Sequence, residues 1–142
     1  MAWLNCPADR DEVTRRDFLD WVERYLLPNS GLPCTALELY SARCGVVHTQ
    51  SPEARATRGG TARKIFYSWG SCRPDTLQAY INIADPGAAV AVEIELVVKA
   101  FELAVDRFVE ESERVPDLAE RVERRLQKIF CDIGPEGLPE LT

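Results

Sequence analysis

Apolar side chains recur every three or four residues over four separate stretches of the chain, with charged residues between them. This spacing places the apolar side chains of each stretch on one face of an α-helix. The stretches are residues 9–27, residues 33 to 47 or 48, the segment after about Glu93, and the segment that starts at Pro116. Four such helices predict a mainly α, four-helix bundle-like domain.

Turn-forming residues mark where these helices begin and end. Residues 28–31 (Pro-Asn-Ser-Gly) stop the first helix, Pro33 opens the second, and residues 134–135 (Gly-Pro) end the last. The start of the long third helix is ambiguous, because residues 90–95 alternate between apolar and other side chains as a strand does. We therefore expect that helix to begin only near Glu93.

Two short segments between the second and third long helices have the composition of strands. Residues 64–69 and 77–83 are rich in aromatic and β-branched side chains and are bounded by Gly, Pro and Ser. They predict a small β-hairpin at about residues 62–84. Because an isolated hairpin is only marginally stable, it is expected to pack on the helices.

The length of 142 residues fits one domain. We expect a single helical domain over residues 1–133 and a loose C-terminal tail over residues 134–142. The first ten residues lack the basic start and apolar run of a signal peptide, and no apolar stretch reaches the roughly 20 residues that a membrane-spanning helix needs. These features predict a cytoplasmic protein with no membrane partner.

The cysteines argue against a disulfide framework and against a zinc site. The chain has five of them and no Cys-x-x-Cys pair. Most are expected to be small buried apolar groups in a reducing compartment. We expect no metal and no cofactor.

The charge of the chain is unevenly distributed. The formal net charge is −6, yet the segment from Arg43 to Arg73 has one acidic residue, Glu53, against six basic residues. Such asymmetry marks a local anion-binding surface on an otherwise acidic protein. The candidate phosphate contacts in this segment are Arg55, Arg58, Arg63 and Lys64. The alternative is that these side chains are solvated or paired with acidic helices.

The only histidine, His48, lies five residues after Arg43 and beside this basic segment. Histidine exchanges protons near neutral pH, and arginine holds a phosphate through two hydrogen bonds while keeping its charge. His48 is therefore a candidate acid or base for RNA cleavage at a ribose 2′-hydroxyl, with Arg43 stabilising charge on the phosphate. Such chemistry needs no metal.

The sequence RCGVVH over residues 43–48 resembles the Arg-x-x-x-x-His motif of HEPN (higher eukaryotes and prokaryotes nucleotide-binding) domains. These domains are all-α bundles, and many are metal-independent ribonucleases of defence systems. The resemblance implies that Arg43 and His48 form a catalytic pair, that RNA or a nucleotide is the ligand, and that the active protein is a homodimer with the pairs near its interface. Many active members have a polar residue after the arginine, where this chain has Cys44.

Other interpretations of these residues remain open. On a regular helix Arg43 and His48 lie about 140° apart, so the helix must end or distort near Gly45, or a partner subunit must bring the two together. Cys44 and His48 share a face and are an alternative thiol site. In a purely structural interpretation, His48 caps a helix C-terminus and Arg43 forms a surface ion pair. The alternative function is a non-catalytic interaction or regulatory module of a bacterial defence or signalling complex.

Overall fold

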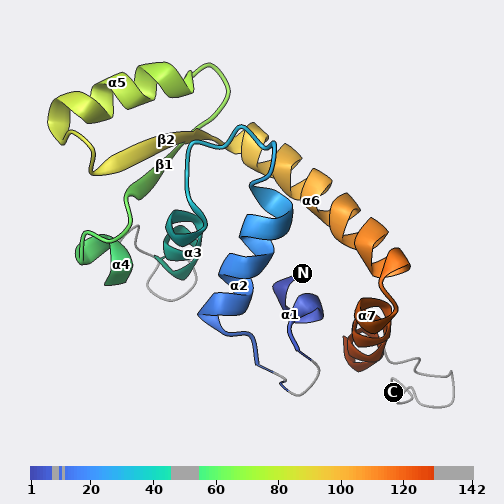
Figure 1. Cartoon of the computed structure of the whole chain (residues 1–142). Helices are drawn as coiled ribbons and strands as arrows, with labels where there is room; N and C mark the ends of the chain where they lie inside the picture. The colour runs from blue at the N-terminus through green and yellow to red at the C-terminus, as the bar shows by residue number, and fades with distance from the viewer. Residues whose placement is uncertain (8–9, 11, 46–54, 130–142) are drawn as a thin grey trace, which may run out of the picture.

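The computed structural model describes residues 1–7, 10, 12–45 and 55–129. Most of these residues are helical (Figure 1). The helices are α1 (Ala2–Asn5), α2 (Arg15–Trp21), α3 (Ala36–Cys44), α4 (Arg55–Arg58), α5 (Pro74–Ala84), α6 (Ile94–Arg114) and α7 (Pro116–Ile129), and α2 continues into a π-helical turn, η1 (Val22–Leu26). The mainly α class is confirmed, and the four expected amphipathic helices correspond to α2 with η1, α3, α6 and α7.

The predicted hairpin is wrong in its second half and in its pairing. Residues 64–69 do contain a strand, β1 (Lys64–Ser68), but residues 77–83 belong to helix α5. The partner of β1 is β2 (Ala89–Glu93), and the two strands are parallel, with Ile65 opposite Val90. Parallel strands need a crossover connection, which α5 provides, so the segment is a β-α-β unit.

Local signals explain why residues 77–83 are helical. Pro74 occupies the first turn of α5, where its missing N–H costs nothing. Leu77 and Ile81 are four residues apart and pack together on one face of the sheet. The side chain of Gln78 donates to the Ala89 carbonyl and accepts from the Ala91 N–H, over 3.4 and 2.8 Å. The helix thus satisfies backbone groups of β2 that face away from β1.

Packing on both faces explains why β2 is a strand. Val90 and Val92 lie in a cluster with Cys34 and Val97 on one face, whereas Ala91 contacts the α5 cluster on the other. All four residues from Ala89 to Val92 are buried. The strand-like alternation noted from residue 90 is therefore real, and α6 begins at Ile94, as expected.

The main core lies between the end of α2, η1, α6 and α7, and it includes Ala36 of α3. Its buried members are Trp21, Val22, Tyr25, Leu26, Ala36, Ala100, Ala104, Phe108 and Leu118. The ring of Tyr25 meets that of Phe108 edge to face at 5.3 Å. Figure 1 shows α6 running from β2 to α7, so one long helix connects the β-α-β unit to the helical part. The expected tail at residues 134–142 lies outside the described residues.

Candidate functional site

Helix α3 carries Arg43, the first residue of the predicted catalytic pair. Thr35 caps the helix: its hydroxyl accepts from the Glu38 N–H, and the Glu38 carboxylate accepts from the Thr35 N–H. This capping box places the first residue of α3 at Ala36 and not near Pro33 as predicted. The helix ends at Cys44, with Gly45 as its C-cap, so Arg43 lies in the last turn, exposed.

Arg63, a predicted phosphate contact, is bound to Glu38. Its Nε donates to Oε1 over 2.6 Å, and a terminal nitrogen donates to Oε2 and to the Pro33 carbonyl over 3.1 Å each. Burial raises the pKa of the Glu38 carboxyl, but the hydrogen bonds from Arg63 and Thr35 outweigh this and lower it. The pair ties the start of β1 to the start of α3.

The structure does not gather the other predicted basic residues into one cluster. Arg58 is exposed on α4, whereas Lys64 opens β1 and lines a pocket with residues of α5. Arg55 is the first residue of α4, but its side chain lies outside the described part of the chain. His48 also lies outside the described residues, so the predicted pair has one member placed.

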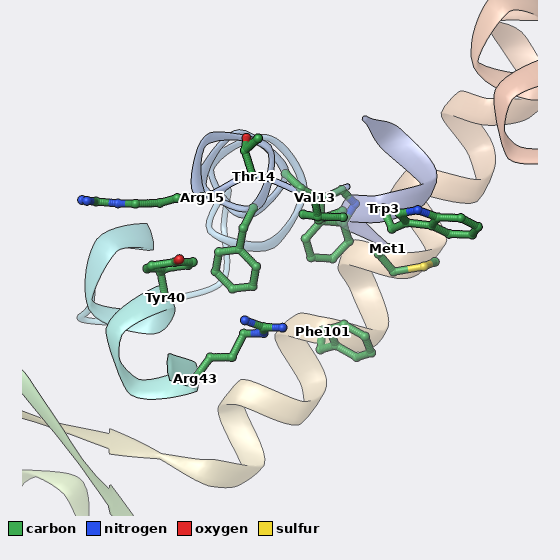
Figure 2. Close-up of a pocket in the computed structure, with 11 residues that line it drawn as sticks. Met1, Trp3, Val13, Thr14, Arg15, Tyr40, Arg43 and Phe101 are labelled. Atoms are coloured by element: carbon green, nitrogen blue, oxygen red, sulfur yellow. The ribbon is translucent and has the colours of Figure 1, made fainter. Parts of the chain in front are cut away.

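Arg43 lines a pocket of about 330 Å³ between α1, α2, α3 and α6 (Figure 2). We call it the arginine–aromatic pocket. Its walls are Met1, Ala2, Trp3, Val13, Thr14, Arg15, Phe18, Trp21, Tyr40, Arg43 and Phe101. Two side chains are cationic and five are aromatic, and no carboxylate is among the described residues of the lining. The indole N–H of Trp21 is buried without a hydrogen-bond partner in the described structure.

Cations and rings contact one another in series along this pocket. The Arg43 guanidinium carbon lies 5.9 Å from the ring centroid of Phe18, and that ring meets Tyr40 edge to face at 5.5 Å. The Arg15 guanidinium carbon lies 5.7 Å from the Tyr40 ring. Rings hold the guanidinium groups through cation–π contacts, which leave the N–H donors available for another partner.

A second capping box fixes the helix turn that carries Arg15. Thr14 caps α2, and its hydroxyl and N–H both donate to Asp17. Arg10 binds the same carboxylate with two hydrogen bonds, of 2.8 and 3.1 Å. Burial raises the pKa of Asp17, but the hydrogen bonds from Arg10 and Thr14 hold it at about 2. Asp17 is therefore ionised at neutral pH, and the first turn of α2 is firmly held.

A buried arginine on α7 holds the N-terminal wall of the pocket. Arg125 donates to the carbonyls of Pro7 and Arg10 over 2.8 Å each and to the sulfur of Cys6 over 2.7 Å. Its guanidinium carbon lies 5.0 Å from the Trp3 ring. Because its N–H groups bind the backbone that follows α1, we assign Arg125 a structural role.

The sequence patterns indicated Arg43 but not Arg15 or Tyr40 as members of this site. Arg15 belongs to a different helix from Arg43, and no spacing within one helix connects them. The available signal was the capping box Thr-x-x-Asp at residues 14–17, which fixes the start of α2 and hence the direction of Arg15. That α2 and α3 pack side by side is a tertiary fact that local periodicity does not contain.

Within the described ranges, no helix is long and apolar enough to cross a membrane, and no cluster of three His, Cys, Asp or Glu side chains could hold a metal ion. No protein-family model matches the chain, and no curated protein or solved structure matches it significantly. The HEPN resemblance is therefore carried by the residues of its motif alone.

Proposed function

We propose that the protein binds a nucleotide or single-stranded RNA in the arginine–aromatic pocket. The observation that carries the proposal is the composition of the lining, in which Arg15 and Arg43 accompany five aromatic rings without a carboxylate among the described wall residues. Arginine pairs with phosphate, and aromatic faces stack on bases of any sequence. The local charge therefore attracts an anion although the whole chain has a net charge of −6.

The orientation of Arg43 fits a phosphate contact. Figure 2 shows its guanidinium directed into the pocket, between α2 and Phe101 of α6. Its face lies near the ring of Phe18, so its edge is free to offer two parallel N–H donors to a phosphate.

Replacing Arg43 with glutamine is expected to weaken nucleotide binding about tenfold or more, because a hydrogen bond to a charged group contributes about 1.5–3 kcal/mol. Fluorescence anisotropy with a labelled single-stranded RNA measures the dissociation constant. Arg114→Gln is the matched control, since Arg114 is an exposed arginine in the last turn of another helix, α6. Equal affinities of the two variants would refute the assignment of Arg43.

Cleavage of the bound RNA is the catalytic extension of this proposal. It rests on the HEPN resemblance and adds His48 as the proton-transfer group and a homodimer as the active form.

A second candidate function, an interaction module, is favoured by exposed apolar side chains on the β-α-β unit. Phe66 is 45% exposed, Tyr80 73% and Ile83 85%, and Trp69 follows β1 at 67%. Large apolar groups gathered on one unit mark protein contact surfaces. The homodimer of the first proposal and a different protein partner both fit this surface.

The interaction module predicts that Ile83→Asp abolishes self-association without loss of folding, because the charge would be desolvated at an interface but harmless in water. Sedimentation velocity before and after the substitution measures the oligomeric state, and circular dichroism reports folding. Glu102→Lys on α6 is the control for a change of surface charge. A wild type that is monomeric at all concentrations would exclude the homodimer.

A further inference from the structure

A second pocket, of about 530 Å³, adjoins the arginine–aromatic pocket and shares two of its walls. Its lining is Arg15, Tyr40, Ser41, Cys44, Ala56, Gly59 and Thr61. Arg15 and Tyr40 belong to both pockets, so this cation and ring stand between two neighbouring hollows. The second hollow is bounded by α3 on one side and by α4 and the turn after it on the other.

One buried hydroxyl beside this second pocket has no hydrogen-bond partner among the described residues. The Ser41 hydroxyl is buried, with the residue 2% exposed, and no group in the described structure bonds it. The hydrogen bond between Tyr40 and Cys44 raises the pKa of the Tyr40 phenol, and burial adds to this. No carboxylate is among the described residues of this lining either.

The side chains of Arg43 and Arg15 point in different directions. Figure 2 shows the Arg43 side chain directed into the first pocket, whereas Arg15 extends away from it past Tyr40. The rings of Tyr40 and Phe18 lie between the guanidinium groups of Arg15 and Arg43 in this series of contacts. A ligand that uses both arginines therefore has two anionic groups, with one flat group for each hollow.

We propose that the ligand is a single strand of at least two nucleotides that spans both pockets. This inference rests on the proposed function and specifies its substrate class. One base lies in the arginine–aromatic pocket, with its phosphate at Arg43. The phosphodiester to the next nucleotide crosses at Arg15, and the second nucleoside lies in the pocket between α3 and α4. A mononucleotide fills the first pocket alone.

The thiol of Cys44 reports on the second pocket directly. Cys44 is a half-buried wall residue of that pocket, whereas Cys72 is exposed and belongs to neither lining. Iodoacetamide alkylation, followed site by site with peptide mass spectrometry, gives one rate for each thiol. The probes are 2′-fluoro-uridine 5′-monophosphate and the corresponding 5′-phosphorylated dinucleotide, which lack the hydroxyl that cleavage requires.

At saturating ligand, the dinucleotide is expected to slow alkylation of Cys44 about tenfold and to leave Cys72 unchanged, while the mononucleotide protects neither. The dinucleotide is also expected to bind about tenfold more tightly, as one further stacked base predicts. Equal protection of Cys44 by the two ligands, or none by a bound dinucleotide, would overturn the two-pocket inference and leave the proposed function intact. Absence of binding by both ligands, and by RNA, would overturn both.

A pair of neighbouring arginines supplies the matched variants. Arg15→Gln is expected to remove the dinucleotide's advantage over the mononucleotide, because Arg15 is the cation that the two pockets share. Arg16→Gln removes the same charge one residue later on α2, where Arg16 is exposed and ion-paired with Asp20. It is expected to keep the advantage. Equal losses in the two variants would show a general effect of charge and refute the placement of a phosphodiester at Arg15.

Discussion

Replacing Arg63 with methionine is expected to lower the free energy of unfolding by about 2 kcal/mol, because it leaves a buried carboxylate without its charged hydrogen-bond partner. Glu38 has a side chain that is only 5% exposed, whereas that of Arg63 is 39% exposed. The substitution leaves the buried carboxylate without its cation. Equilibrium urea unfolding, followed by circular dichroism, measures the change.

The pH dependence of the loss identifies its cause. The folded-state pKa of Glu38 is lowered from its usual 4.5, so the pair stabilises the fold above about pH 4.5 and loses this effect as the pH falls through the lowered value. Wild type and Arg63→Met are therefore expected to differ most at neutral pH and to converge in acid. A constant difference between pH 7 and pH 3 would contradict this assignment.

A double variant separates the ion pair from the packing of the arginine side chain. Glu38→Gln alone also breaks the pair but keeps an acceptor for the Thr35 N–H. Added to Arg63→Met, it should cost much less than it does in the wild type, because the buried charge is already unpaired. Arg58→Met is the control, since Arg58 is exposed on α4. An effect of Arg58→Met as large as that of Arg63→Met would refute a specific role for the pair.

Helical periodicity predicted the mainly α class and four of the helices, because each of these helices buries one face; the four-helix bundle arrangement is not confirmed. The β-α-β unit was not predicted, because the spacing of Leu77 and Ile81 fits a strand face and a helix face equally well. Pro74 distinguishes the two, since proline favours a first helical turn, but that signal is weak beside a run of β-branched residues. Parallel pairing of β1 with β2 then depends on contacts between residues about 25 positions apart, which no local pattern encodes.

The predictability of the site follows the same division. Arg43 was predicted because it is part of the Arg-x-x-x-x-His motif. The basic segment was predicted because charged residues can be counted in the sequence. That Arg63 is bound to Glu38 was not visible, because the acid belongs to helix α3, 25 residues earlier in the chain. The partnership of Arg43 with Arg15, Phe18 and Tyr40 arises where α2 packs on α3. The number of charged residues in the sequence identifies a basic segment, whereas the packing of the fold determines which of its arginine and lysine side chains can contact a ligand.

Replacing His48 with alanine is expected to reduce RNA cleavage by about 10²–10⁴-fold, the usual contribution of a positioned acid or base. The assay is digestion of single-stranded RNA in EDTA, with detection of 2′,3′-cyclic phosphate ends. His48 would accept the 2′-hydroxyl proton, and Arg43 would stabilise charge on the phosphate, so Arg43→Gln is expected to cost about 10²–10³-fold. Arg16→Gln, on the surface of α2, is the active control.

Binding and cleavage have different requirements, and this keeps the two proposals separable. Without His48, the arginine–aromatic pocket still has the Arg43 guanidinium group and all of its rings, so His48→Ala should bind RNA with wild-type affinity. Loss of Arg43 should impair both steps, because the same phosphate contact holds the ligand and stabilises the transition state. A wild type that binds RNA but cleaves none across a broad set of sequences would refute the catalytic role of His48. The Arg43 pocket would then remain as a binding site without chemistry.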